Sequence, residues 1–276
     1  MTVGISGLGL IGGSMAKAYK RAGHTVYGFD TSEAALGFAQ IAGICDGVLD
    51  EKSLPLCELI LVALYPRDAI KYFEKIAPVI SKNAVVIDLC GTKKTVCAAG
   101  FSLAERYGFT FVGGHPMAGT HLSGIKHSSA DLFKGAPMVL VPHIYDDINF
   151  LEKIKNLLAP AGFGRFSVTT AQKHDEIIAF TSQLAHIVSN AYVKSPTATA
   201  HKGFSAGSYK DLTRVAWLNE NMWTELFLEN KEPLLFEIDM LITSLKEYRQ
   251  AIADNDADRL REILKLGRKA KEKIDG

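Results

Sequence analysis

The sequence predicts an α/β domain built on a doubly wound, mostly parallel sheet, followed by an all-helical domain. Short apolar runs alternate with helical stretches in the first part of the chain, as expected for buried parallel strands with helices on both faces. Glycine and proline, which interrupt helices and strands, then become rare, since 20 of the 24 glycines fall at or before Gly164 and only Pro196 and Pro233 follow residue 160. The predicted domains span residues 1–168 and 169–276.

Seven strands are predicted in the first domain. Continuous runs of β-branched and apolar residues are typical of strands in a parallel sheet. The four clearest runs are Thr2–Ser6, Thr25–Phe29, Leu59–Leu64 and Ala84–Asp88. Three further candidates are Phe109–Val112, Met138–Val141 and Arg165–Val168.

Apolar residues recur at three- and four-residue steps from about residue 170 onward, which is the period of a helix. The stripe from Ile177 to Tyr192 predicts one long helix. Three later helices are expected over Leu212–Leu228, Leu234–Ile252 and Leu260–Ile274. Four such helices with wide apolar stripes bury only part of their apolar surface on their own, so we expect a homodimer through this domain.

Composition excludes several classes of protein. Lys and Arg number 31 against 30 Asp and Glu, and the resulting net charge of +1 favours neither nucleic acid nor anionic membranes as partners. No apolar run approaches the roughly 20 residues of a spanning helix, and the N-terminus lacks the pattern of a secretory signal, so we expect a cytoplasmic protein. Four cysteines without a C-x-x-C pair indicate reduced thiols, and no metal is expected. They are Cys45, Cys57, Cys90 and Cys97.

A glycine-rich motif follows the first predicted strand and opens a helical stretch. This strand, glycine turn and helix is the context that a dinucleotide-binding motif requires, with the helix N-terminus facing the pyrophosphate. The motif residues, all expected to contact the cofactor, are Gly7, Leu8, Gly9, Leu10, Ile11 and Gly12. The alternative is an ordinary glycine turn.

Asp30 ends the second predicted strand, where a carboxylate accepts hydrogen bonds from the adenosine ribose hydroxyls and repels a 2′-phosphate. No Arg or Lys follows in Thr31-Ser32-Glu33, so NAD is favoured over NADP. Leu64 and Tyr65 follow the third long strand and are predicted to border the cofactor; an ordinary strand-to-helix turn is an equal alternative.

His115 lies in Gly113-Gly114-His115-Pro116-Met117, an imidazole among small residues directly after an apolar run. A histidine in such a stretch is a candidate general base, because its ordinary pKa of about 6.5 leaves it neutral near physiological pH. A loop histidine with a hydrogen-bonding role is the alternative.

The chain resembles the prephenate dehydrogenases, which oxidatively decarboxylate prephenate to 4-hydroxyphenylpyruvate in tyrosine biosynthesis. The resemblance covers essentially the whole chain. It rests on Gly7 to Ser14, Gly114 to Thr120, Ser182-Gln183-Leu184-Ala185-His186, Lys210-Asp211-Leu212-Thr213-Arg214, Met222-Trp223 and Glu229-Asn230. It implies a Rossmann-type NAD-binding domain and an all-helical dimerisation domain.

The resemblance also implies residue roles. His115 matches the histidine that accepts the ring hydroxyl proton while hydride leaves C4 for NAD. Arg214 matches the arginine that binds a substrate carboxylate, for which a planar two-pronged donor is well suited. His186 matches a second active-site histidine, Thr120 a pocket residue, and Trp223 an aromatic that lines the site, in some members from the partner subunit.

Three positions depart from the family pattern. Many members have a serine after the fourth strand that orients the histidine and the ring hydroxyl, and here Gly91 or, with a shift of one residue, Thr92 takes its place. His121 stands where some members have an acidic partner for the arginine. Gln183 replaces a histidine found in others.

Alternative functions remain open at this point. The substrate is prephenate or, with an amino in place of the keto group, arogenate; a broad cyclohexadienyl dehydrogenase accepts both. A β-hydroxyacid-type dehydrogenase would use Lys173, and a non-catalytic dinucleotide sensor would bind NAD without turnover. Lys93 and Lys94 are expected in a solvated turn, as is usual for two adjacent lysines; the alternative is that they approach a phosphate or a carboxylate. The remaining histidines are expected at the surface or in helix caps: His24, His127, His143, His174 and His201.

Overall fold

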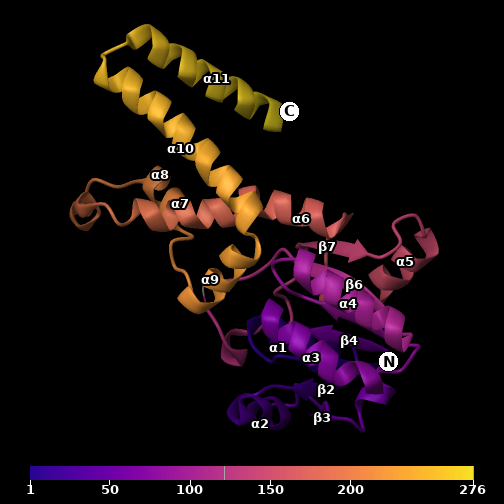
Figure 1. Ribbon diagram of the computed structural model, residues 1–276. Helices are drawn as coiled ribbons and strands as arrows, with labels where there is room; N and C mark the ends of the chain where they lie inside the picture. The colour runs from indigo at the N-terminus through magenta and orange to yellow at the C-terminus, as the bar shows by residue number, and fades with distance from the viewer. Residues whose placement is uncertain (121, 276) are drawn as a thin grey trace.

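A single sheet organises the first domain of the computed structural model, which describes residues 1–120 and 122–275 (Figure 1). Among these residues, eight strands pair in the order β3-β2-β1-β4-β5-β6-β7-β8. Every neighbouring pair is parallel except β6 and β7, which confirms the predicted fold class. The strands are β1 (Thr2–Ser6), β2 (Thr25–Phe29), β3 (Gly47–Val48), β4 (Leu59–Val62), β5 (Val85–Asp88), β6 (Thr110–Pro116), β7 (Pro137–Pro142) and β8 (Arg165–Val168).

The sheet has an apolar core on each face. Alternate residues of β4 divide between the two cores, with Leu59 and Leu61 on one side and Ile60 and Val62 on the other, as the two-residue period of a strand requires. Helices α1 (Leu10–Arg21) and α5 (Ile148–Leu157) contribute to the first core and helices α3 (Pro66–Ile76) and α4 (Lys94–Tyr107) to the second. Helix α2 (Glu33–Ile41) follows β2.

The strand order reverses between β1 and β4. Ligands of doubly wound sheets bind in the crevice at the carboxyl ends of the strands at such a switch point. The ends of β1, β4, β5 and β6 all lie at this one edge, because these four strands are parallel. The glycine motif and His115 therefore lie at the same edge of the sheet.

The second domain is helical. Its helices are α6 (Ala171–Ile178), α7 (Ala185–Tyr192), α8 (Gly207–Thr213), α9 (Glu220–Glu229), α10 (Lys231–Ala253) and α11 (Ala257–Asp275). A π-helical turn, Ala179–Leu184, joins α6 to α7, so the predicted long helix is nearly continuous. The single helix predicted over 212–228 is wrong, because the Asn219 side chain accepts a hydrogen bond from the Met222 amide at 3.0 Å and starts α9 anew.

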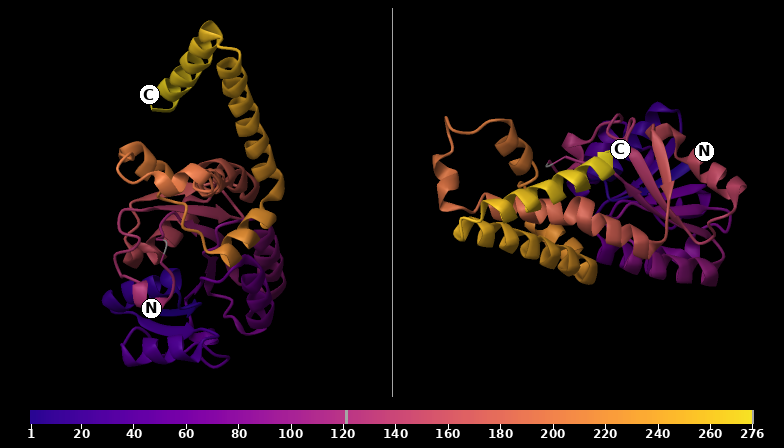
Figure 2. Two further views of the ribbon diagram at one scale, coloured as in Figure 1. Left: turned by 90° about the vertical axis from the view of Figure 1, so that its left-hand side faces the viewer. Right: turned by 90° about the horizontal axis from the view of Figure 1, so that it is seen from above.

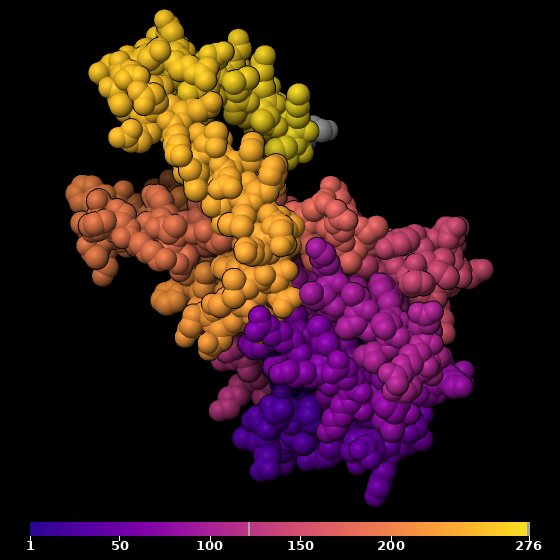
Figure 3. All heavy atoms as spheres, in the orientation of Figure 1, coloured from indigo at the N-terminus to yellow at the C-terminus, as the bar shows by residue number. Residues whose placement is uncertain are grey.

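Helices α10 and α11 form a hairpin. The first part of α10 packs on the π-helical turn and on α6, and the rest of the hairpin projects away from the molecule (Figures 2 and 3). Leu235, Ile242, Leu245 and Ile252 recur at seven- and three-residue steps along α10 and are all exposed, so one apolar face of this helix has no cover within the described chain. No helix among residues 1–120 and 122–275 is long and apolar enough to cross a membrane.

Candidate active site

The glycine motif forms a close turn between β1 and α1. Gly7 has a φ of +82°, and a Cβ there would lie 2.4 Å from the Ala63 carbonyl oxygen. A Cβ on Gly12 would lie 1.8 Å from the Gly7 carbonyl oxygen, whereas a Cβ on Gly9 would meet nothing within 4 Å. The first two glycines thus allow the turn to close, and Gly9 leaves open space at the first turn of α1, as a pyrophosphate requires.

Asp30 joins the motif to the end of β2. Its Oδ2 accepts a hydrogen bond from the Leu8 amide at 2.7 Å, and its Oδ1 accepts one from the Ser32 amide at 2.8 Å. The carboxylate is half-buried, and each oxygen retains a second lone pair for a ribose hydroxyl. Leu10 and Ile11, half-buried, begin α1, while Leu8 is buried in the core.

Leu64 and Tyr65 lie in the turn from β4 to α3, at the carboxyl edge. The Leu64 carbonyl accepts a hydrogen bond from the Cys90 thiol at 3.3 Å. Tyr65 precedes α3 and is exposed. This turn lies across the switch point from the glycine motif, because Gly7 packs directly on Ala63.

His115 lies within β6, paired with Val139 of β7, so the alternative of a loop histidine is wrong. Strand alternation directs it to the face that Phe111 shares with α4. There its Nδ1 lies 2.9 Å from Nε2 of His174, whose Nδ1 lies 2.7 Å from Oδ1 of Asp175. The two histidines are 59 residues apart in sequence and in direct contact in space.

Electrostatics keep His115 neutral. Burial lowers its pKa well below the ordinary 6.5, and the neighbouring His174 and the positive charge of Lys93 lower it further. Burial also lowers the pKa of His174, although the hydrogen bond to Asp175 opposes this shift. A neutral imidazole at physiological pH is able to accept a proton.

Lys93 is fully buried and forms an ion pair with Asp88 at the end of β5. Burial disfavours its charge, but the Asp88 carboxylate, together with Cys90 and Cys97, outweighs burial and raises the pKa of Lys93. The Gly114 amide donates to Asp88 at 3.2 Å, and a Cβ on Gly114 would lie 2.6 Å from the Asp88 carbonyl oxygen. The glycine before His115 therefore lets β6 approach this ion pair.

Two of the residues predicted for the substrate side lie together on the helical domain. The rings of His186 and Trp223 are 4.1 Å apart between centroids, so Trp223 contacts a histidine of its own chain. Burial lowers the pKa of His186, and the positive charge of Arg214 lowers it further. Arg214 is exposed at the end of α8 and forms no ion pair with any carboxylate in the described part of the chain.

Helix α9, which carries Trp223, packs on the first turn of α3 and on the β5–α4 loop. Its Glu225 side chain accepts a hydrogen bond from the Arg67 amide at 2.9 Å, and Leu226 would lie 3.3 Å from a Cβ on Gly91. Next to Gly91, Thr92 is buried, and its hydroxyl has no hydrogen-bond partner among the described residues. Such an unpaired buried hydroxyl is costly unless a ligand or water satisfies it.

Thr120 is exposed beyond the end of β6, and its hydroxyl accepts a hydrogen bond from the Leu122 amide at 3.2 Å. His121 lies outside the described residues. Gln183 is buried on the π-helical turn between α6 and α7 and holds this turn to the α9–α10 corner, because its Nε2 donates to the Leu226 carbonyl and its Oε1 accepts from the Asn230 side chain. It therefore has a packing role in this structure.

Two expectations from the sequence are wrong. His174 is buried against His115, not at the surface, and Lys93 is buried in an ion pair, not in a solvated turn. The burial of His174 could have been predicted from the sequence, because the apolar stripe of the long helix, extended by one turn before Ile178, reaches position 174. The burial of Lys93 was not predictable from local sequence, because it depends on the ion pair with Asp88 and on the packing of its side chain against Gly113.

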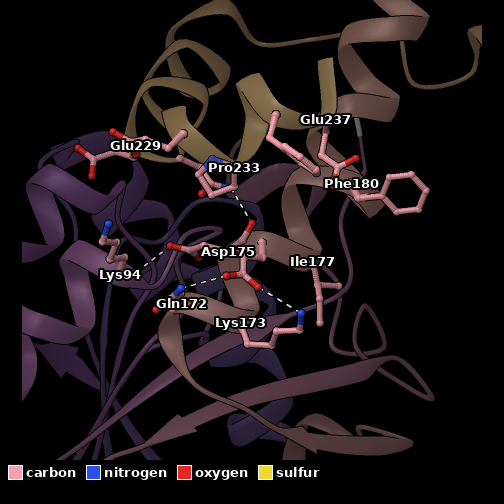
Figure 4. Close-up of a pocket in the computed structure, with 13 residues that line it drawn as sticks. Lys94, Gln172, Lys173, Asp175, Ile177, Phe180, Glu229, Pro233 and Glu237 are labelled. Carbon is pink, nitrogen blue, oxygen red and sulfur yellow. Dashed lines mark hydrogen bonds and ion pairs between the residues drawn. The ribbon is translucent and has the colours of Figure 1, made fainter. Parts of the chain in front are cut away.

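A separate groove of about 710 Å³ opens between α6, α10 and the start of α4 (Figure 4). Its rim is mostly charged, with Lys94, Lys173 and Glu229 among its residues. The Lys173 ammonium points along this rim, 3.2 Å from Glu176. Asp175 lines the groove, whereas His115, Arg214 and His186 do not, so the groove lies behind the site described above.

Comparisons with known proteins agree with this arrangement. Residues 15–166 match the family model for the prephenate dehydrogenase nucleotide-binding domain, and residues 170–266 match that for the prephenate dehydrogenase dimerization domain. The prephenate dehydrogenase of Bacillus subtilis is 31% identical over 286 residues, covering 100% of this chain and 76% of that protein. The cyclohexadienyl dehydrogenase of Zymomonas mobilis is also 31% identical, covering 98% of this chain and 94% of that protein.

Among solved structures, the prephenate dehydrogenase from A. aeolicus in complex with hydroxyphenyl propionate and NAD+ is similar, with a TM-score of 0.83 and 28% identity. The match covers 99% of this chain and 98% of that one. The open glycine turn with its carboxylate at the end of β2 fits the same cofactor. The chain belongs to the prephenate dehydrogenase family and is an NAD-dependent oxidoreductase.

Proposed function

We propose that this protein oxidatively decarboxylates prephenate to 4-hydroxyphenylpyruvate, with His115 as the proton acceptor. The observation that carries the proposal is the partly buried contact at 2.9 Å between His115 and His174, in surroundings that hold the pKa of His115 well below 6.5. A neutral imidazole at the carboxyl edge of the sheet is able to take the ring hydroxyl proton. The neighbouring glycine motif places NAD at the same edge.

The glycine motif and Asp30 would hold NAD, which would supply the acceptor for the hydride of ring C4; loss of carbon dioxide would then leave an aromatic ring. The protein's own residues position the substrate. We assign Arg214 to a substrate carboxylate, because its guanidinium has no carboxylate partner among the described residues and the substrate is a dianion.

The remaining predicted residues line the pocket in this proposal. The rings of His186 and Trp223, tilted against each other, form a wall near Arg214. The Thr92 hydroxyl, buried and unpaired, replaces the family serine and meets the ring hydroxyl, while Gly91 leaves room below α9. Thr120 closes the pocket beyond β6.

Asp30 underlies the preference for NAD over NADP. Its carboxylate is fixed by the Leu8 and Ser32 amides at the end of β2, where a 2′-phosphate would meet a negative charge. The contacts of Leu64 and Tyr65 with the cofactor belong to the same proposal, because their turn borders the glycine motif.

Arogenate is the second candidate substrate, since a cyclohexadienyl dehydrogenase is among the relatives. A β-hydroxyacid-type reaction is disfavoured, because Lys173 is exposed and paired with Glu176 away from His115. The deciding experiment follows NADH absorbance after prephenate or arogenate is added to the purified protein with NAD. Turnover identifies the substrate; NAD binding without turnover of either compound would favour the non-catalytic sensor.

A homodimer through the C-terminal helices is part of the proposal. The exposed apolar face of α10 at Leu235, Ile242, Leu245 and Ile252 needs a cover, and the matching family model is a dimerization domain. Trp217, exposed beside Arg214 in sequence, is a second apolar side chain that a partner subunit would bury. A cytoplasmic location stays a prediction from the sequence.

A further inference from the structure

We propose that His174 and Asp175 act as positioning residues that fix the tautomer and orientation of His115, leaving the lone pair on its Nε2. The inference rests on the proposed role of His115 as the base. It adds a reason why one nitrogen of that ring, and not the other, is the acceptor.

Hydrogen bonds to backbone and side-chain donors hold Asp175 in place at the end of the row of contacts from His115 through His174 to Asp175. Its Oδ1 accepts a hydrogen bond from the Lys93 amide at 2.8 Å, and its Oδ2 accepts one from the Lys94 amide at 2.9 Å. Both amides belong to the N-terminus of α4, where a carboxylate is favoured. In addition, the Asn230 side chain donates to the Asp175 carbonyl at 2.8 Å and holds its backbone.

These partners determine the protons on the two imidazoles. Because both carboxylate oxygens of Asp175 act as acceptors, the Nδ1 of His174 must donate at 2.7 Å. In a neutral imidazole only one nitrogen carries a proton, so the Nε2 of His174 is an acceptor. The Nδ1 of His115 must then donate at 2.9 Å, and its Nε2 is left unprotonated.

The charges around the pair support neutral rings. His174 and Asp175 are both buried, and Lys93 is the cation on the same side, paired with Asp88. Burial lowers the pKa of both histidines. The neighbouring His174 and then the charge of Lys93 lower the pKa of His115 further, and Lys93 also lowers the pKa of His174, against the opposing effect of Asp175. The assignment of one proton to each ring requires both imidazoles to be neutral, because both nitrogens of a charged imidazole are donors. A carboxylate that accepts an imidazole N–H proton, and so fixes the tautomer and orientation of a basic histidine, is also found in other enzymes.

Two substitutions of His174 separate positioning from packing. His174→Leu fills space but removes the acceptor for the His115 Nδ1 proton, and we expect kcat to fall by about 10²-fold, the typical cost of a misplaced catalytic group. His174→Gln retains an oxygen acceptor at a similar reach, and we expect kcat to recover to within about fivefold of wild type. KM for NAD should stay within about threefold in both, because neither change touches the glycine motif. Lys173→Ala, on the exposed side of the same helix turn, is the control and should behave as wild type.

A spectroscopic measurement tests the tautomer without turnover. Nitrogen-15 NMR of the histidine rings at pH 7.5, with His115 assigned by comparison with His115→Asn, should show His115 protonated at Nδ1 and bare at Nε2 in wild type and in His174→Gln. Protonation at Nε2 in wild type would overturn the proposal, as would wild-type kcat in His174→Leu or a Gln variant as slow as the Leu variant. Should the Leu variant not fold, the Gln variant and the wild-type spectrum decide. Absence of turnover in wild type would refute the proposed function alone, since the spectrum tests the tautomer independently.

Discussion

The glycine motif allows a paired prediction in which two similar substitutions have opposite consequences. An added Cβ at position 12 would lie 1.8 Å from the Gly7 carbonyl oxygen, about 1.6 Å inside the 3.4 Å at which ordinary contact begins. At position 9 the same methyl would meet nothing within 4 Å, and the φ of −70° suits any residue. Gly12→Ala should therefore damage the fold, whereas Gly9→Ala should damage only the cofactor site.

The expected magnitudes follow from these contacts. Overpacking typically costs about 1–3 kcal/mol, and the Gly12 clash is with backbone that cannot rotate away, so we expect about 3 kcal/mol. At roughly 2–4 °C per kcal/mol for a chain of this size, Tm should fall by about 6–12 °C. Gly9→Ala should change stability by less than about 0.5 kcal/mol, yet its methyl occupies the space of the pyrophosphate, and Kd for NAD should rise at least about tenfold.

Thermal unfolding followed by circular dichroism gives Tm, and calorimetric titration with NAD gives Kd for the Gly9→Ala and wild-type proteins. Wild-type affinity for NAD in Gly9→Ala would refute the placement of the pyrophosphate over this turn. A large loss of Tm in Gly9→Ala would refute the claim that position 9 faces open space.

Three further predictions concern the pH profile, the substrate and the assembly. Because the pKa of His115 lies well below 6.5, its free base persists as the pH falls through 6.5. We therefore expect kcat/KM, measured from initial rates, to stay level from pH 8 to 6.5 and to decline only at lower pH. A midpoint of the pH profile at or above 6.5 would contradict this expectation. Arg214→Ala should raise KM for the substrate by about 10- to 100-fold through loss of a charge-assisted pair with Kd for NAD unchanged, and an unaltered KM would exclude Arg214 from substrate binding. Leu245→Glu places a charge on the exposed apolar face of α10 and should shift the protein from dimer to monomer, as measured by light scattering. Glu247→Gln is the control and should remain a dimer. A dimer that persists in Leu245→Glu would place the interface elsewhere.

The strands were predictable because their residues are locally uniform. Runs such as Leu59-Ile60-Leu61-Val62 have no polar member, so the choice of a buried strand does not depend on distant contacts. Strand β3 was missed because the two residues Gly47 and Val48 are too few to show any period. The split between α8 and α9 was missed because the apolar spacing continues across the break, and only the Asn219 cap interrupts it.

The site was predictable in part for a similar reason. His115 and the glycine motif stand out in short windows of sequence, and the family resemblance identified Arg214 and His186. Lys93 and His174 looked ordinary, because charged residues are usually exposed unless paired. Their partners are remote in sequence: Lys93 binds Asp175 through its amide across 82 positions, and His174 meets His115 across 59. Burial of such groups is decided by tertiary contacts, which no local pattern contains.

The central claim is that His115 is the proton acceptor of an NAD-dependent oxidation of prephenate or arogenate. His115→Asn tests it most directly, because the shorter amide has a donor near the position of the ring Nδ1 and lacks any counterpart of Nε2. Measured by NADH formation at saturating substrate, kcat should fall by about 10²–10⁴-fold, with Kd for NAD and Tm close to wild type. Turnover at the wild-type rate in this variant would contradict the account.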